Sequence, residues 1–274
     1  MCARYGQVAA WARDAGYDGV QLASSNAKLI DQFLSPFYNR RTDEFGGSAE
    51  ARARILELIR WHIAQRAGAD FTCTVKVPIQ EKAPPLTPRT TWAEGLQLVK
   101  LCEEWGYDSV TPVHVSVLPD TTLSRGGIPV SLWRNKAMQT RFKRAAPKRF
   151  ERGVLMAGYV GGGVASPFKP VWNRSRFRAA KAMTDLPVLA VGGIRTRAEV
   201  EQILQDGEAD MVGIGRPFYA EPDLARRILG DDRMHDPQDH GLCRNSNMCV
   251  PAQMLGMKGV CYNPEVVKVR RAGR

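Results

Sequence analysis

Short apolar segments alternate with helical patterns along the chain, and this alternation constrains the fold more than any other feature. The helical segment 90–106, for example, ends at Gly106 and leads directly into the strand-like segment 107–117. Ser48 and Gly68 suit the two ends of a longer helix. Because parallel strands need a crossover that is usually a helix, the pattern predicts β–α–β units. We expect helices at 3–15, 49–67, 90–106, 173–184, 197–207 and 222–229, and strands at 17–23, 70–78, 107–117, 186–193 and 209–215.

Length and composition suit one large α/β unit. A chain of 274 residues is long for an ordinary domain, but eight-stranded β/α barrels reach this length as a single unit. We find no long apolar run and no secretory signal, so we expect a soluble, cytoplasmic protein without a membrane partner. Six cysteines are too few for a disulfide framework, and we interpret Cys2, Cys73 and Cys102 as buried or partly buried thiols.

The segment 118–170 interrupts the alternation. It is rich in glycine, proline and basic residues, and we expect a long loop insertion in which only 132–146 is helical. Part of the net charge of +11 is concentrated here, because 134–152 holds eight basic residues against one acid, Glu151. A solvated helix and loop explains these charges. Nucleic-acid binding is the alternative, but the chain has no nucleic-acid fold signature, so we expect no such partner.

Glycine turns end the last two strand-like segments. Gly192 and Gly193 follow one strand, and Gly215 followed by Arg216 ends the next. Glycine lets the backbone approach an anion, and free N–H groups at a helix start bind phosphate oxygens. In β/α barrels the loops after the last two strands commonly hold a phosphate. Arg216 adds a fixed cation with a forked donor set. Tight turns without a ligand are the alternative.

Five stretches together carry a family signature. They are AGYDGVQL (15–22), QFLSPFYNRRTDEFGGS (32–48), VKVP (75–78), AVGGIRT (190–196) and GIGRPFYAEPDL (213–224). With them the chain resembles the Old Yellow Enzyme, or NADH:flavin oxidoreductase, family, near the branch of 2,4-dienoyl-CoA reductase and trimethylamine dehydrogenase. The resemblance implies a (β/α)8 TIM barrel that binds FMN at the carboxyl ends of its strands. It also implies that NAD(P)H reduces the flavin, which passes hydride to an acceptor, often an activated alkene.

The resemblance implies roles for the residues of the cofactor site. Gly192, Gly193, Gly215 and Arg216 would hold the FMN phosphate. Lys76 matches a family arginine beside the N1/O2 edge of the flavin, where a cation favours the anionic reduced form. Lysine supplies this charge without the planar fork of arginine. A solvated or salt-bridged strand residue is the alternative for Lys76.

The substrate side departs from the family. The family places a His, then a His or Asn three residues later, and a Tyr two residues beyond that one. The corresponding residues here are Ala23, Asn26 and Lys28. Asn26 can still donate a hydrogen bond to a substrate oxygen, whereas Ala23 has no donor. Lys28 could act as an acid or an anion anchor if burial lowered its pKa; a solvent-facing lysine is the alternative. The alternation of side chains along 107–117 is compatible with His114 facing the flavin and equally with His114 facing away from it.

The strand count also departs from the family. The chain starts at the family's helix before strand four, so the resemblance implies strands 4–8 of a barrel, a partial barrel with open edges. Residues 1–230 would form this portion, with 118–170 after strand six as a candidate lid, and 231–274 would form a cysteine-containing tail. A late-called start, a split gene or a decayed copy would explain this. An oligomer or a complementing N-terminal half would then be a partner.

Three cysteines in the tail have the spacing of an iron–sulfur motif with one change. In the branch that the chain resembles, four thiolates bind a [4Fe–4S] cluster, as a close trio followed by a fourth. Cys243, Cys249 and Cys261 fit this frame, and Ser246 occupies the remaining position. A serine alkoxide rarely replaces a thiolate, so an intact cluster is doubtful. We expect packed free thiols, and a three-iron or labile cluster is the alternative.

The sequence therefore predicts an FMN-dependent oxidoreductase that uses NAD(P)H to reduce a small organic acceptor. Asn26 and Lys28 are the candidate catalytic residues, and Lys76 with the two glycine turns is the candidate cofactor site. The alternative is a catalytically inactive remnant that acts as a flavin-binding or assembly module. The substitutions at Ala23 and Lys28 and the missing strands favour this alternative, whereas the intact glycine turns favour the enzyme.

Overall fold

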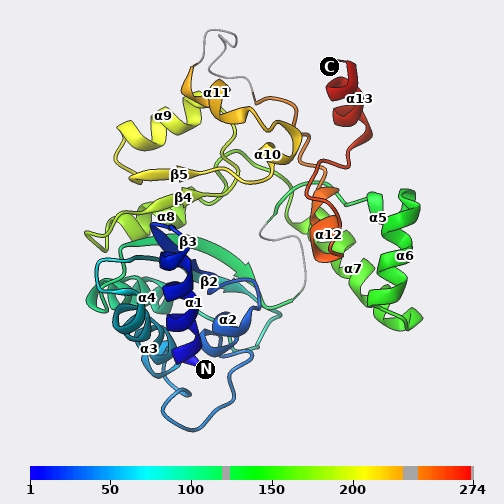
Figure 1. Cartoon of the computed structure of the whole chain (residues 1–274). Coiled ribbons are helices and arrows are strands. Elements are labelled where there is room, and N and C mark those ends of the chain that lie inside the picture. Colours follow the sequence, from blue (N-terminus) through cyan, green and yellow to red (C-terminus); the bar gives the residue numbers. More distant parts are fainter. Residues whose placement is uncertain (119–123, 231–239, 273–274) are drawn as a thin grey trace. The chain divides into compact units, whose positions relative to one another are not determined.

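The computed structural model describes residues 1–118, 124–230 and 240–272 (Figure 1). The described residues form two compact units. Unit 1 comprises 1–118, 173–191 and 207–212, and unit 2 comprises the other described residues. None of the helices in these ranges is long and apolar enough to span a membrane.

Unit 1 is built on open parallel sheets. A three-stranded parallel sheet has the order β1-β2-β3, and a second pair, β4-β5, is linked to it by an isolated parallel bridge between Val110 and Val188. Each strand lies within a segment expected from the sequence or overlaps it, so the predicted α/β class is confirmed. The strands are β1 Gly19–Leu22, β2 Thr72–Lys82, β3 Ser109–Ser116, β4 Leu189–Val191 and β5 Met211–Gly213, the last residue of which belongs to unit 2.

The three-stranded sheet has one apolar and one polar face. Val75 pairs with Val110, and both are fully buried, as are Cys73 and Val77. Side chains alternate along a strand, so the neighbouring residues lie on the opposite face. This polar face carries Gln21, Thr74, Lys76 and Thr111, and the side chain of Gln21 donates a 3.3 Å hydrogen bond to Oγ1 of Thr111.

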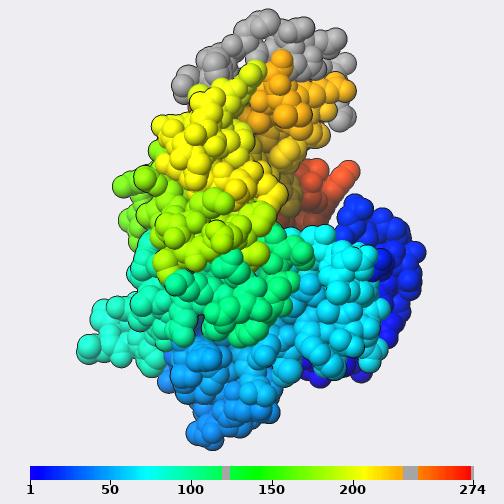
Figure 2. All heavy atoms as spheres, turned by 90° about the vertical axis from the view of Figure 1, so that its left-hand side faces the viewer, coloured from blue at the N-terminus to red at the C-terminus, as the bar shows by residue number. Residues whose placement is uncertain are grey.

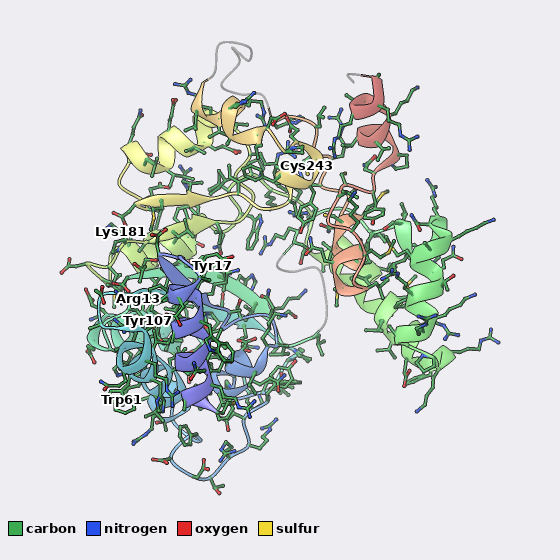
Figure 3. All side chains as sticks on the ribbon, in the orientation of Figure 1. Arg13, Tyr17, Trp61, Tyr107, Lys181 and Cys243 are labelled. Carbon is green, nitrogen blue, oxygen red and sulfur yellow. The ribbon has the colours of Figure 1, made fainter. Side chains whose placement is uncertain are left out.

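Capped helices cover unit 1. Its helices are α1 Cys2–Asp14, α2 Leu29–Leu34, α3 Ala49–Ala67, α4 Trp92–Glu104 and α8 Arg174–Lys181. Ser48 accepts a hydrogen bond from the N–H of Ala51, and Gly68 ends the helix at a φ of 95°, so both predicted ends of α3 are confirmed. α1 packs along α3 (Figures 1 and 2). Tyr107, labelled in Figure 3, is buried and donates to the carbonyl of Leu56 on α3 at 2.8 Å.

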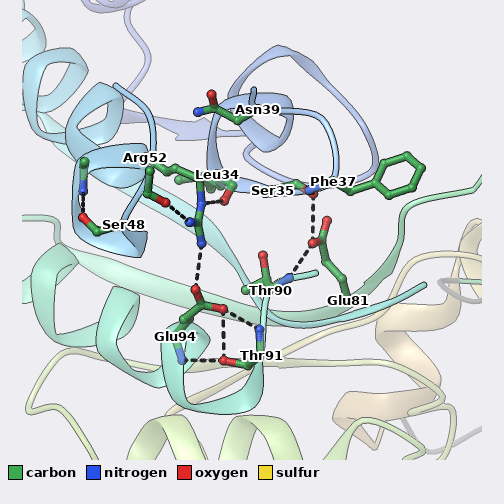
Figure 4. Close-up of polar contacts among 12 residues, drawn as sticks. Leu34, Ser35, Phe37, Asn39, Ser48, Arg52, Glu81, Thr90, Thr91 and Glu94 are labelled. Atoms are coloured by element: carbon green, nitrogen blue, oxygen red, sulfur yellow. Dashed lines mark hydrogen bonds and ion pairs between the residues drawn. The ribbon is translucent and has the colours of Figure 1, made fainter. Parts of the chain in front are cut away.

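A buried guanidinium joins three of these helices (Figure 4). The side chain of Arg52 on α3 is 5% exposed and donates to the carbonyl of Leu34 at 2.8 Å and to Oε1 of Glu94 on α4 at 2.8 Å. It also donates to the carbonyl of Gly47. Three acceptors on different segments satisfy one buried cation, so Arg52 holds the 34–48 loop against α4.

Unit 2 is mainly helical. Its helices are α5 Ser131–Arg134, α6 Lys136–Ala145, α7 Arg149–Ala165, α9 Arg197–Gln205, α10 Pro217–Ala220, α11 Leu224–Leu229, α12 Cys249–Met254 and α13 Pro264–Ala272. The predicted helix at 132–146 is present as α5 and α6, but α7 lies where only loop was expected. A core of Leu132, Met138, Tyr159 and Ala252 joins the helices of this segment to α12.

Candidate functional site

The loop that carries the candidate substrate residues is held in a left-handed conformation. Asn26 has a φ of 67° and Ala27 a φ of 53°. The N–H of Ala27 donates to Oδ2 of Asp31 at 2.6 Å, and the side chain of Gln32 donates to the carbonyl of Ala27 at 2.8 Å. Non-glycine residues rarely adopt a positive φ. The two hydrogen bonds from residues of α2 hold the loop in this conformation.

The side chains of Asn26 and Lys28 are exposed in this loop. Asn26 is therefore available to donate a hydrogen bond to a ligand. Lys28 lies in the same loop and is exposed rather than buried. Its position agrees with the solvent-facing alternative and leaves the role of an anion anchor.

Behind this loop lies a buried pair of carboxyl groups that sequence reasoning missed. Asp31 is 1% exposed and Glu81 on β2 is 3% exposed. Burial raises the pKa of Asp31 to about 7; the N–H of Ala27 opposes this rise, and the charge of Glu81 adds to it. Glu81 accepts hydrogen bonds from Oγ of Ser35 at 2.9 Å and from the N–H of Thr90 at 2.7 Å (Figure 4). The sequence does contain a sign of this pair, because Asp31 lies within the otherwise largely apolar segment LIDQFL.

Lys76 lies on the polar face of the sheet, in register with Thr111 of β3. Its side chain is half-buried, and its carbonyl accepts a hydrogen bond from the hydroxyl of Ser24. This bond ties β2 to the loop that follows β1. His114 is also half-buried and lies in register with Gln80.

The first glycine turn is shaped by packing. Gly192 has a φ of 110° and Gly193 a φ of 88°, both in the region that favours glycine. A Cβ on Gly193 would lie 2.7 Å from the carbonyl oxygen of Lys169 and 2.7 Å from the ring of Trp172. Gly193 is therefore required by the close approach of the 169–172 segment, in agreement with the tight-turn alternative at this residue.

Three N–H groups at the start of α9 are bonded within a capping box or beside it. Glu199 accepts hydrogen bonds from the N–H of Arg195 at 2.7 Å and of Thr196 at 3.0 Å. The hydroxyl of Thr196 accepts from the N–H of Glu199 in return, which completes a capping box. The N–H groups of Arg195 and Thr196 are therefore already bonded and are not free for a phosphate.

The second glycine turn leaves space. Gly215 is exposed, and within the described residues a Cβ there would meet no atom within 4 Å. Arg216 follows it, half-buried, and its Nη1 donates to the neutral amide oxygen of Asn247 at 2.5 Å. Burial lowers the pKa of Arg216, which indicates a cation with little compensating charge. An open turn beside such a cation suits a phosphate.

The tail brings its three cysteines near Arg216. Cys243 and Cys249 are buried, and Cys261 is half-buried. Burial raises the pKa of Cys249 to about 11, although the guanidinium of Arg216 lowers it; the neighbouring Cys243 and Cys261 raise it further. Figure 3 labels Cys243.

These thiols do not fit a four-ligand metal site. Within the described ranges, no group of three or more His, Cys, Asp or Glu side chains is placed to hold a metal ion. Ser246, in the remaining position of the motif, accepts a hydrogen bond from the side chain of Asn263 at 3.3 Å. Burial raises the pKa of Cys249 and of Cys261 and so favours their protonated form, whereas iron binds thiolates.

The predicted site residues fall in both units. Unit 1 holds Asn26, Lys28 and Lys76, and the carboxyl pair adds Asp31 and Glu81. Unit 2 holds the two glycine turns, Arg216 and the three tail cysteines, and within it the hydrogen bond to Asn247 joins Arg216 to the tail.

Comparisons with known proteins find relatives over most of the chain. The chain is 31% identical over 217 residues to an NADH oxidase of Thermoanaerobacter brockii, covering 79% of this chain and 27% of that protein. It is 24% identical over 243 residues to a cinnamate reductase of Clostridium sporogenes, covering 83% and 30%. The structure of histamine dehydrogenase from Rhizobium sp. 4-9 matches with a TM-score of 0.69 at 18% identity, covering 97% and 32%.

The chain thus spans about a third or less of the length of these relatives. A family model described as NADH:flavin oxidoreductase / NADH oxidase matches residues 1–148 and 164–233 and leaves out most of α7. The match includes the loop after β1, Lys76 and both glycine turns. The chain belongs to the NADH:flavin oxidoreductase / NADH oxidase family.

Proposed function

We propose that the chain is an FMN-dependent oxidoreductase that uses NAD(P)H to reduce a small organic acceptor. The observation that carries this proposal is the open turn at Gly215 beside the half-buried cation of Arg216, within the family match. A relative that reduces cinnamate, by its name, supports an activated alkene as the acceptor class. We further propose that the five strands correspond to strands 4–8 of a barrel, with 231–274 as a separate tail.

Unit 2 would bind the phosphate. Gly215 leaves the backbone accessible, and Arg216 supplies the charge with two or more N–H donors. Gly192 and Gly193 would shape the neighbouring turn. An anion at Arg216 would offset the desolvation that lowers its pKa, so binding is favoured by electrostatics as well as by shape.

Unit 1 would supply the groups that act on the flavin edge and the acceptor. Lys76 is proposed for the flavin edge, because it lies on the polar face of the sheet and adds a charge to the neutral side chains of Gln21, Thr74 and Thr111. Asn26 would donate a hydrogen bond to an oxygen of the acceptor, and Lys28 would attract an anionic acceptor. FMN, when bound, accepts hydride from NAD(P)H and delivers it to the acceptor.

A second candidate function is a flavin-binding or assembly module without catalysis. The exposed Lys28 and the donor-free Ala23 favour it, because the substrate side then offers one neutral donor, Asn26. A flavin-binding module would use the same phosphate site as the enzyme but would not transfer hydride. Reduction of bound flavin by NADH or NADPH therefore separates the two.

The test is purification of the chain followed by FMN titration and anaerobic addition of NADPH or NADH. We expect a bound flavin absorption band that the nicotinamide bleaches. Arg216→Ala should weaken FMN binding by roughly 10- to 100-fold, the effect of losing a charge-assisted hydrogen bond. Arg226→Ala, which removes an exposed arginine of α11, is the matched control. A folded chain that binds no FMN contradicts the enzyme and the flavin-binding module and favours the assembly module, whereas a bound flavin that stays oxidised supports the flavin-binding module.

A further inference from the structure

After its charged first turn, helix α7 is apolar on every side. From Gly153 to Ala165 its sequence is GVLMAGYVGGGVA, which contains no charged residue. Met156 and Tyr159 on one side pack into the core formed by Leu132, Met138 and Ala252. A helix at the surface of a globular protein normally carries polar residues on its outer side, and one that is apolar all round is normally covered.

The opposite side of α7 is exposed. Phe150 is 79% exposed, Val154 51%, Val160 38% and Val164 71%. At 3.6 residues per turn these four positions span about 120° of the helix surface, so they lie in one stripe on one side of the helix. We call this stripe, together with the exposed small residues between them, the α7 outer face; the small residues are Gly153, Ala157 and Gly161.

The α7 outer face is symmetric about Ala157. Valine lies three residues before and after it, at Val154 and Val160. Glycine lies four residues before and after it, at Gly153 and Gly161. Seven residues away, the large apolar side chains of Phe150 and Val164 complete the stripe.

This order fits an antiparallel copy of the same helix. With a two-fold axis at Ala157, each position meets its counterpart: Val154 faces Val160 of the second copy, and Gly153 faces Gly161 of the second copy. Among the described residues, a Cβ on either glycine would meet no atom within 4 Å, so this side is free for close approach. Isologous contacts of this kind are the commonest arrangement in homo-oligomers.

The charges at the ends of α7 select the antiparallel direction. Lys148 and Arg149 are exposed at the amino end, whereas the last turn, which ends at Ala165, carries no basic residue. The carboxyl end of a helix carries a partial negative charge that cations stabilise. An antiparallel pair places the cations of one copy beside the carboxyl end of the other. A parallel pair would place like charges together.

We propose that the α7 outer face is an interface at which two copies of this chain pair, antiparallel, with Ala157 at the two-fold axis. The proposal goes beyond the oxidoreductase function and requires no cofactor. One pair of helices buries less surface than the roughly 1,200 Å² of a stable interface, so we expect a weak dimer. Residues 149–163, most of this helix, lie outside the family match, so this interface would be particular to chains that carry the segment.

The first test is molar mass against concentration by sedimentation velocity. Between ~1 and ~100 µM, a range that covers weak interfaces, the mass should rise from 30.4 kDa toward twice that value. The double substitution Val154→Glu with Val160→Glu should keep the chain monomeric throughout, because it places four carboxylates in the interface. Leu229→Glu on α11, a residue that is 82% exposed, is the matched control and should leave the mass profile unchanged. Circular dichroism verifies that each variant is folded.

The second test maps the direction by disulfide cross-linking of mild variants. A mixture of Val154→Cys and Val160→Cys chains should form the mixed dimer, whereas Val154→Cys alone should not cross-link above the wild-type background. In the antiparallel pair the two copies of position 154 lie six helical residues apart, ~9 Å along the axis, beyond the Cα separation of a disulfide.

Three results would overturn the proposal. One is a mass of 30.4 kDa at every concentration. Another is a dimer that the glutamate pair leaves intact, or one in which Val154→Cys alone cross-links. The third is a wild-type chain that stays monomeric and co-sediments with phosphatidylcholine–phosphatidylglycerol vesicles unless the glutamates are present, which would make the face a membrane contact.

Discussion

The guanidinium of Arg216 donates a hydrogen bond to the side-chain oxygen of Asn247 at 2.5 Å. Asn247 in turn donates to the carbonyl of Gly127 at 3.0 Å. The cation proposed for the FMN phosphate is therefore oriented by an amide of the cysteine-bearing tail. Because the amide is neutral, it positions Arg216 without cancelling the charge.

Asn247→Asp should weaken FMN binding. The new carboxylate would pair with Arg216 and compete with the phosphate, and a loss of about tenfold in affinity corresponds to ~1.4 kcal/mol. FMN titration by fluorescence measures the change. Asn135→Asp adds the same charge at the N-cap of α6, a position that tolerates aspartate, and should leave the affinity unchanged. Equal FMN affinities for the wild type and Asn247→Asp would show that Arg216 does not bind the phosphate.

Asp31 should make the stability of the chain fall as pH rises toward neutrality. Burial raises the pKa of this carboxyl from 3.8 to about 7, so between these values the native state holds a proton that the unfolded state has lost. Between these two pKa values the free energy of unfolding then decreases by ~1.4 kcal/mol for each unit that the pH rises. Urea unfolding at pH 5 and pH 8 measures the difference.

Asp31→Asn should remove this part of the pH dependence. The amide oxygen can still accept the N–H of Ala27, and no charge forms in the buried site. The unfolding free energy at pH 8 should therefore rise relative to the wild type. Asp14→Asn at the exposed end of α1 is the control and should preserve the wild-type slope. An unchanged slope in Asp31→Asn would assign the pH dependence to other groups.

Arg52→Ala should destabilise the chain strongly. It removes a buried cation that holds three acceptors and leaves Glu94 and two carbonyls without it, a loss of about 3 kcal/mol or more. Arg54→Ala on the same helix is the control, because its ion pair with Glu44 is about half-exposed and should contribute at most ~1 kcal/mol. Urea unfolding of both variants tests the ranking, and comparable losses would contradict the role given to Arg52.

The tail should bind iron poorly until a fourth thiol is supplied. After anaerobic reconstitution we expect the wild-type chain to hold fewer than four irons, because Ser246 bonds to Asn263 and the pKa of Cys249 is raised. Ser246→Cys should raise the iron content and add charge-transfer absorbance. Ser166→Cys, a buried serine outside the tail, is the control. Four irons per wild-type chain would overturn the interpretation of packed thiols.

The local patterns of the sequence predicted the α/β scaffold well. Ser48 and Gly68 end α3 as expected, and the strand-like segments all contain strands, although β4 and β5 are shorter than their apolar runs. These features depend on neighbouring residues, so a single sequence reveals them.

Features that depend on distant residues were not predicted. Asp31 and Glu81 are fifty positions apart, and only the fold brings them together. α7 was expected to be a loop because it contains five glycines, which disfavour helix. Packing of Met156 and Tyr159 against α12 outweighs this preference. The capping box of Thr196 and Glu199 had a readable T-x-x-E signal that was overlooked.

The capping box at α9 has a consequence for the order of folding and binding. Because Thr196 and Glu199 each accept a hydrogen bond from the N–H of the other, this turn is held without a ligand. The entropy of ordering this turn is then lost when the chain folds, before any cofactor arrives. A phosphate that binds beside Gly193 would then meet a turn that is already ordered.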